Sequence, residues 1–240
     1  MAFVEGFVAA IPVANREAFL DHARRAGRVF GQFGAARIVD AWGDDVPKGE
    51  KTDFYRAVAA KEDEAISFGW IEYADRATRD AASAEMMSEA SAAEIGEMPF
   101  DGRRMIFGGF EPVVDRGGAG KAGYVEGFVG AVPTLNKEKF IVHADKAAPL
   151  FLRAGALRVV ECWGVDVSRG KVTDFPRSVK AQDDETVIFS WVEWPDKATR
   201  LAGQQRLFAE METHMKDNPM PFDAQRMIVG TFEIISDARG

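Results

Sequence analysis

Hydrophobic residues recur along this chain with two spacings, every second residue in short runs and every third or fourth residue in longer ones. Residues 3–11 form an apolar run that ends at Pro12, which predicts a strand. Asn15 is a suitable cap for a helix in which apolar residues recur until Gly34. The same reasoning predicts a strand at 36–42, an extended piece at 55–60, a strand at about 65–73, a helix at about 76–94 and a strand at about 104–113.

This pattern is present twice, because the chain contains two copies of one sequence. Residues 4–8 (VEGFV) recur at 125–129, and residues 98–101 (MPFD) recur at 220–223. A repeat of this length is a small domain rather than one unit of a solenoid. We therefore predict a first repeat at 1–115, a flexible glycine-rich linker at 116–123 and a second repeat at 124–240.

The predicted order of elements in each copy is β-α-β-β-α-β, which is the order of a ferredoxin-like antiparallel sheet with both helices on one face. The strands are nevertheless apolar on both faces, so the face without helices also needs a cover. The other copy can supply it. We therefore predict an α+β fold in which two ferredoxin-like repeats form an intramolecular pseudo-dimeric α/β barrel with the helices outside.

The composition narrows the class of function. A net charge of −8 argues against a nucleic-acid or anionic-membrane partner, because either would need a basic patch. No apolar stretch approaches the roughly 20 residues of a membrane span, and the N-terminus lacks the features of a signal peptide. We therefore expect a cytoplasmic protein. Cys162 is the single cysteine, which excludes an internal disulfide, and neither zinc-type spacing nor another cofactor motif is evident.

Both copies keep a polar loop between the second and third strands, with the pattern WGxDVxxGxxTDFxR at 42–56 and 163–177. Loops usually diverge faster than cores, so this one suggests a role. One interpretation is a lip over a pocket, in which Arg56 and Arg177 bind an anionic ligand and tryptophans stack on it. The other is structural, with turns that fix the loop and arginines that pair with aspartates. The candidate ligand-binding residues are Trp42, Asp45, Asp53, Arg56, Trp70, Trp163, Asp166, Asp174, Arg177 and Trp191.

Each main strand also carries a carboxylate in both copies. A buried carboxylate must pair with a cation or take up a proton. Glu72 or Glu193, near the tryptophans, could therefore be a general base. The alternative is a set of ion pairs with duplicated arginines at strand ends or on the barrel seam. The carboxylates are Glu5, Asp40, Glu72, Glu111, Glu126, Glu161, Glu193 and Glu233, and the arginines are Arg37, Arg104, Arg158 and Arg226.

His22 and His143 are the only histidines present in both copies. Each flanks the apolar stripe of the first helix of its copy. There it could ligate haem or a metal, or act as a base between helix and sheet. The alternative is a half-buried histidine held by one hydrogen bond.

Each copy resembles an uncharacterised bacterial family, domain of unknown function 1428. The resemblance covers nearly all of both copies and rests on YVEGFV at 124–129, GALRVVECW at 155–163, KVTDF at 171–175 and MPFD at 220–223. The family is placed in the dimeric α/β-barrel superfamily and its members are typically single-copy, which implies a barrel made here by one chain. It implies no reaction. The first copy departs from the pattern at Ala41, opposite Cys162, and at Tyr55, opposite Pro176.

Three classes of function are consistent with these residues. The first is binding of a small anionic or aromatic molecule in two similar but not identical pockets between sheet and helices. The second is an enzyme, a cofactor-independent or haem-type monooxygenase or an isomerase, whose pocket should join a tryptophan to an ionisable Glu or His. The third is a structural interaction module with filled spaces under its helices. The chain would act as a monomeric pseudo-dimer or pair further into a homodimer.

Overall fold

A computed structural model describes residues 1–118 and 120–240, so Ala119 of the predicted linker lies outside the described residues. The first copy contains β1 (Phe3–Pro12), α1 (Arg16–Gln32), β2 (Ala35–Asp45), α2 (Phe54–Ala57), β3 (Glu64–Tyr73), α3 (Arg76–Met86), α4 (Glu89–Ile95) and β4 (Ile106–Gly117). The second copy contains β5 (Tyr124–Pro133), α5 (Lys137–Ala154), β6 (Arg158–Asp166), α6 (Phe175–Ser178), β7 (Glu185–Trp194), α7 (Lys197–His214) and β8 (Ile228–Arg239).

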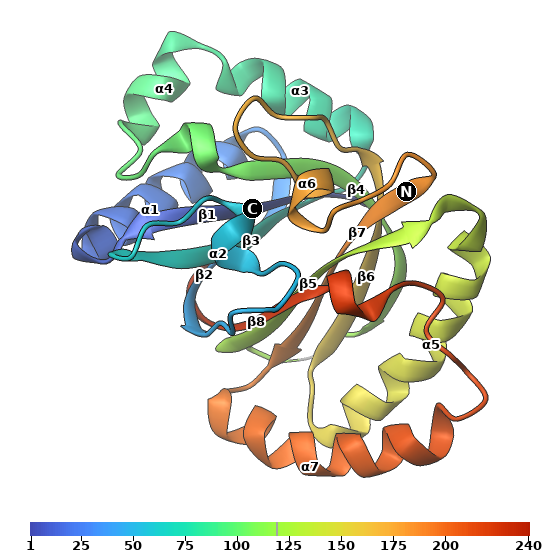
Figure 1. Cartoon of the computed structure of the whole chain (residues 1–240). Helices are drawn as coiled ribbons and strands as arrows, with labels where there is room; N and C mark the ends of the chain where they lie inside the picture. The colour runs from blue at the N-terminus through green and yellow to red at the C-terminus, as the bar shows by residue number, and fades with distance from the viewer. Residues whose placement is uncertain (119) are drawn as a thin grey trace.

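The strands form one closed antiparallel barrel in the order β1-β3-β2-β8-β5-β7-β6-β4. The strands of each copy are neighbours, and the two copies join where β2 pairs with β8 and β4 pairs with β6. The long helices of the two copies lie on opposite sides of the barrel (Figure 1). The predicted intramolecular pseudo-dimeric α/β barrel is therefore confirmed.

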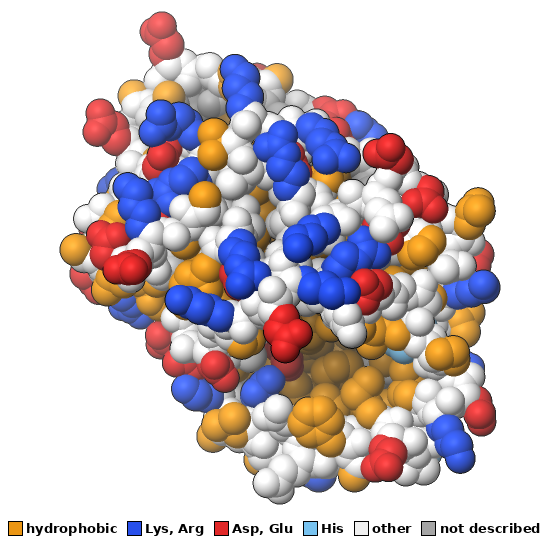
Figure 2. Space-filling view, in the orientation of Figure 1, with side chains coloured by type: hydrophobic (Ala, Val, Ile, Leu, Met, Phe, Trp, Pro, Cys, Tyr) orange, Lys and Arg blue, Asp and Glu red, His pale blue; other side chains and the backbone are white. Residues whose placement is uncertain are grey.

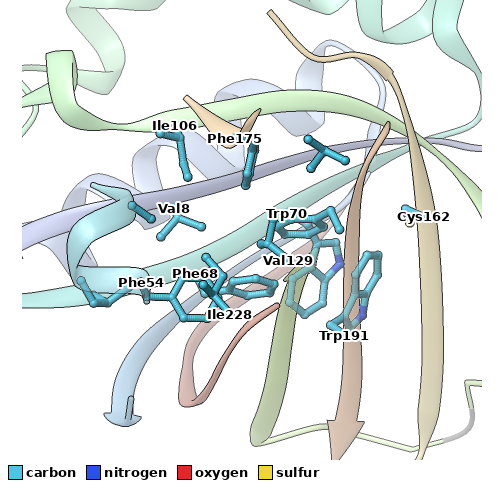
Figure 3. Close-up of a cluster of buried hydrophobic side chains, with 14 of the residues drawn as sticks. Val8, Phe54, Phe68, Trp70, Ile106, Val129, Cys162, Phe175, Trp191 and Ile228 are labelled. Atoms are coloured by element: carbon cyan, nitrogen blue, oxygen red, sulfur yellow. The ribbon is translucent and has the colours of Figure 1, made fainter. Parts of the chain in front are cut away.

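The interior of the barrel is filled by aromatic side chains from both copies. Phe68 stacks on Phe189 with ring centroids 4.7 Å apart, and Trp70 stacks on Trp191 at 4.5 Å (Figure 3). A Cβ atom at Gly6 would lie 2.9 Å from the Phe189 ring, so only glycine fits opposite it. Interdigitation of this kind gives the interior the packing of an organic crystal and leaves little room for a ligand there.

Three predicted elements differ in the structure. The segment predicted to be extended at 55–60 instead begins with the short helix α2, whose N-cap is Asp53. The helix predicted at 76–94 is two helices, because Ser88 caps a new helix, α4, after α3 has ended. β4 continues to Gly117 and pairs with β6, so the first residues of the predicted linker belong to a strand.

A network of ion pairs crosses between the two copies. Arg37 of β2 donates to both carboxylate oxygens of Glu193 at 2.8 and 2.9 Å. Arg158 of β6 makes the matching pair with Glu72 at 2.8 and 3.0 Å. Each arginine therefore binds a strand carboxylate of the other copy, in the bidentate geometry that gives the strongest charged hydrogen bonds. Two further carboxylates hold the other edges of these guanidinium groups, Asp237 on Arg37 and Asp115 on Arg158.

Replacing Arg37 by leucine should destabilise the fold strongly. Its side chain is 7% exposed, and removing one partner of a buried pair usually costs about 3–5 kcal/mol because the other charge remains buried. Arg56→Leu is a matched control, since the Arg56 side chain is 55% exposed and a surface change of this kind costs about 0.5 kcal/mol or less. Urea unfolding measures both, and equal midpoints for the two variants would contradict the expectation.

Candidate functional site

Two cavities lie between the outer face of the barrel and the helices, one in each copy. Cavity one has a volume of about 360 Å³ and lies under α1, α3 and α4. Cavity two has a volume of about 320 Å³ and lies under α5 and α7, where Figure 2 shows a hollow lined by apolar side chains. Equivalent positions of the two copies line both cavities, namely Glu5 and Glu126, Phe19 and Phe140, His22 and His143, and Asp40 and Glu161.

Strand alternation places the carboxylates in cavity one. Val39 and Ala41 of β2 belong to the barrel core, so Asp40 between them points outward to the helices. Glu5 of β1 is outward for the same reason. His22 faces the same space from α1. The sheet and the first helix thus bring three ionisable side chains to one apolar cavity.

Burial changes the ionisation of these groups. Asp40 is 6% exposed, and burial raises its pKa to about 7. Burial also raises the pKa of Glu5, an effect that the positive charge of Arg79 partly opposes. The pKa of His22 is lowered by burial and by the charge of Arg25. Near neutral pH, cavity one therefore presents a neutral imidazole and a carboxyl group that exchanges its proton in the physiological range.

Two buried polar atoms of cavity one, Oγ of Ser67 and Nδ1 of His22, have no hydrogen-bond partner among the described residues. Ser67 is fully buried. Such groups are uncommon, because a buried polar atom without a partner costs about 1–3 kcal/mol. A ligand with a polar substituent would supply the missing partner.

Cavity two keeps the same plan, but its equivalents of Glu5 and His22 are paired. Oγ of Ser190 and Nε1 of Trp194 in its wall have no hydrogen-bond partner among the described residues. Glu126 accepts a hydrogen bond from Nη2 of Arg200 at 2.8 Å, and Nδ1 of His143 lies 3.1 Å from the carbonyl oxygen of Asn218. Burial raises the pKa of Glu161 to about 7. The two cavities are thus similar in volume and position but differ in the pairing of their charged groups.

Each of the two loops predicted to form a lip places a phenylalanine side chain inside the barrel. The Asp53 carboxylate accepts the backbone N–H of Arg56 at 2.8 Å, and Asp174 makes the matching bond in the second copy at 2.7 Å. These caps fix Phe54 and Phe175, both fully buried, in the barrel core (Figure 3). The duplicated loop pattern therefore has a role in the packing of the barrel, and Asp166 and Asp174 of the second loop also line a cleft.

The arginines of these loops lie outside both cavities. Arg56 and Arg177 are 55% and 48% exposed, and each lies beside the aspartate three residues before it. Asp45 is exposed. Asp166 forms an ion pair with Arg79 and lines a separate polar cleft of about 460 Å³. None of these four residues lines a helix–sheet cavity, so the predicted anion site of the loop is not formed there.

The predicted tryptophans and bases are also placed elsewhere. Trp70 and Trp191 are fully buried inside the barrel, and their Nε1 atoms donate to Glu72 at 3.0 Å and Glu193 at 3.1 Å. These two glutamates belong to the ion-pair network between the copies and line neither helix–sheet cavity. The remaining pair, Trp42 and Trp163, packs on Phe19 and Phe140.

Asp40 and Glu161 are among the duplicated carboxylates noted in the sequence, but Glu72 and Glu193 were preferred there as general bases. The alternation of inward and outward side chains along each strand could have identified Asp40 and Glu161 as facing the helices. Glu72 has the same parity as the buried Trp70 and belongs to the inner face, whereas Asp40 lies between the two inner residues Val39 and Ala41. The histidines were candidates, and both line cavities.

The described part of the chain holds no group of three or more His, Cys, Asp or Glu side chains arranged to bind a metal ion. No helix of residues 1–118 and 120–240 is long and apolar enough to cross a membrane. Cys162 is buried in the barrel core, where burial raises the pKa of its thiol. A thiol in that state is not a reactive nucleophile.

Comparison with known proteins gives the family. The model of the family described as "Protein of unknown function (DUF1428)" matches residues 2–102 and 123–224. The chain belongs to this family. "Uncharacterized protein YbaA" of Escherichia coli K12 is 50% identical over 116 residues, which are 48% of this chain and 99% of that protein. The two matched segments of the family model correspond to the two copies.

Solved structures share the fold at low sequence identity. A "putative monooxygenase" from Lactobacillus acidophilus NCFM has a TM-score of 0.57 and 12% identity, over 100% of this chain and 97% of its own. An anthrone oxidase-like protein has a TM-score of 0.55 and 11% identity, over 99% of this chain and 92% of its own. At such identities the likeness establishes the barrel architecture alone.

Removing the loop caps should destabilise the protein without touching either cavity. Asp53→Ala and Asp174→Ala each lose a side-chain hydrogen bond to a helix N-terminus, so each should lower the free energy of unfolding by about 1–2 kcal/mol. Thermal melting and protease sensitivity of the two single variants measure the effect. Unchanged melting temperatures and unchanged cleavage in both would show that the caps do not organise the loops.

Asp40 should make stability fall as the pH rises. An unfolded aspartate titrates near its ordinary pKa of about 3.9, so between that pH and about 7 the folded state binds more protons. Stability then decreases by up to about 1.4 kcal/mol per pH unit until Asp40 ionises. Asp40→Asn should remove this decrease.

Urea unfolding of wild type and Asp40→Asn at several pH values between 4.5 and 7.5 tests the effect. The difference between the two proteins isolates Asp40 from His22, whose lowered pKa acts in the opposite direction. Parallel curves for the two proteins would contradict a raised pKa at Asp40.

Proposed function

We propose that this protein binds small, mainly apolar molecules in cavity one and cavity two, and that Asp40 exchanges a proton with the molecule in cavity one. The observation that carries the proposal is a buried carboxyl group with a pKa of about 7 in an apolar cavity. A general acid or base works best when its pKa lies near the working pH.

The size and lining of the cavities support binding of a molecule with one or two rings. Volumes of about 360 and 320 Å³ fall at the lower end of the range of small-molecule sites, which are usually apolar with a few converging polar groups. In cavity one the wall includes Phe7, Phe19 and Phe30, and the polar groups are Asp40 and Ser67. This combination favours an apolar body with a hydroxyl or amino substituent.

The three classes of function predict different spaces under the helices. A structural interaction module would have filled this space, and a passive carrier would line it without groups of shifted pKa. The cavities contain both open volume and carboxyl groups with raised pKa values. These features favour the enzyme class, with proton transfer as the reaction type.

A second candidate is a monooxygenase or isomerase, the class suggested by the monooxygenase-like names of proteins that share the fold. The specific observation in its favour is again Asp40, because removal of a proton from an acidic O–H or C–H group begins an isomerisation and equally prepares a substrate for attack by dioxygen. In a haem-type version His22 or His143 would be the residue that holds the iron. The pairing of His143 with the Asn218 carbonyl at 3.1 Å favours His22 for this role.

Binding of 1-naphthol, followed by titration calorimetry, tests the proposal. Wild type should bind in both cavities. Ala26→Phe fills cavity one and Ala147→Phe fills cavity two, so each variant should lose one of the two sites and keep the other. If 1-naphthol does not bind, or if both variants bind it like wild type, the cavities are not the sites.

A matched pair of ligands tests the role of Asp40. In the Ala147→Phe background, Asp40→Leu should weaken 1-naphthol binding about ten- to a hundredfold, since a hydrogen bond to a charged or buried group is worth about 1.5–3 kcal/mol. Naphthalene, which has no hydroxyl group, should bind equally to both proteins. Equal losses for the two ligands would mean that Asp40 only shapes the cavity.

A further inference from the structure

We infer that cavity one selects an apolar molecule that carries a protonated amino group, whereas cavity two does not. This inference rests on the proposed function, because it names the ligand class of a site that must first bind small molecules. It is drawn from a difference between two equivalent arginines, Arg79 of α3 and Arg200 of α7.

Arg200 neutralises the carboxylate of its own cavity. Its Nη2 atom donates to Glu126 at 2.8 Å, and its Nη1 atom donates to Gln204 at 3.1 Å. Both partners line cavity two. Glu126 is therefore already paired, and a cationic ligand would have to displace an arginine that is itself 13% exposed.

Arg79 is instead bound to Asp166 at the end of β6, and Arg76 binds the same carboxylate at 3.4 Å. Among the described residues Arg79 makes no hydrogen bond to Glu5. Asp40 also accepts no hydrogen bond from any described residue. In cavity one, Glu5 and Asp40 both lack a bound cation within the described chain. At the matching positions of cavity two, only Glu161 lacks one.

A substitution on the other copy explains this difference. Asp44 of β2 binds Lys197 at 2.7 Å and accepts a hydrogen bond from Tyr124, which leaves Arg200 of the same helix free to bind Glu126. The residue equivalent to Asp44 in the second copy is Val165. With that carboxylate missing, both arginines of α3 gather on Asp166. Glu5 is left without a hydrogen-bonded cation, and the charge of Arg79 acts on it only from a distance.

Two further groups of cavity one suit an ammonium ligand. Oγ of the fully buried Ser67 and Nδ1 of the buried His22 have no hydrogen-bond partner within the described chain. Oγ of Ser190, at the matching position of cavity two, has none either, so of these two groups only His22 distinguishes the cavities. An ammonium group has three donors and no acceptor, so hydroxyl, imidazole and carboxylate acceptors together match it. Among the described residues no Lys or Arg lines cavity one, so a carboxylate or phosphate there would face Glu5 and Asp40 without a cation to bind and would be disfavoured.

The test compares 2-(1-naphthyl)ethylamine with its uncharged analogue 1-ethylnaphthalene by titration calorimetry at pH 7.5. With cavity two filled by Ala147→Phe, the amine should bind about ten- to a hundredfold more tightly than the analogue. With cavity one filled by Ala26→Phe, the two ligands should bind with similar affinity. Equal affinities in the Ala147→Phe protein would overturn the inference while leaving the proposed function intact. If neither naphthalene derivative bound either protein, both would fail.

Three single changes test the role of the arginines, with melting curves to confirm folding. Glu5→Gln should reduce the preference of cavity one for the amine. Asp166→Ala, which lies outside cavity one, should do the same by releasing Arg79 to bind Glu5. Arg200→Met should create a preference for the amine in cavity two, because it leaves Glu126 unpaired. An amine preference that none of the three changes moves would overturn the assignment, even if wild type prefers the amine.

Discussion

Each half of the barrel has an inner face of valine, phenylalanine and tryptophan side chains that only the other half can bury. Phe68 and Trp70 of one copy stack on Phe189 and Trp191 of the other, and the edges of the two sheets pair along β2–β8 and β4–β6. Closure removes every free sheet edge from the described strands and covers the apolar faces at once. The two copies therefore share one closed barrel.

This closure also decides where a ligand can bind. The interior is packed with aromatic rings, and the two copies are also joined by the Arg37–Glu193 and Arg158–Glu72 ion pairs. The open volume is left on the outer face, under the helices, where cavity one and cavity two lie. Alternate residues of a strand point to opposite faces of the barrel wall, so a strand carboxylate either joins the copies or faces a cavity. Inward carboxylates such as Glu72 hold the copies together, whereas outward ones such as Asp40 face a cavity.

The fold could be predicted because it depends on two features of the sequence. The hydrophobic periodicity is local, and the repeat is found by comparing the chain with itself. The site could be predicted only in part. The histidines and the position between helix and sheet were anticipated, but Glu72 was preferred to Asp40 because its neighbours are aromatic. Whether those neighbours line a cavity or fill a core depends on how two sheets meet. The duplicated loop was ambiguous for a related reason, since Asp53 and Phe54 contribute to the packing of the barrel and this could not be seen in the sequence.

A chain with a single copy could build this barrel only from two identical halves, and its two cavities would then be identical. Duplication within one chain removes that constraint. Because each cavity is flanked by a strand end of the opposite copy, a change in one copy alters the cavity of the other. Asp44 in the first copy leaves Arg200 to the second cavity, and Val165 in the second copy leaves Glu5 of the first cavity unpaired. The charge of each cavity therefore depends on a residue of the opposite copy. The two sites can differ without a change in the aromatic side chains and ion pairs that join the copies.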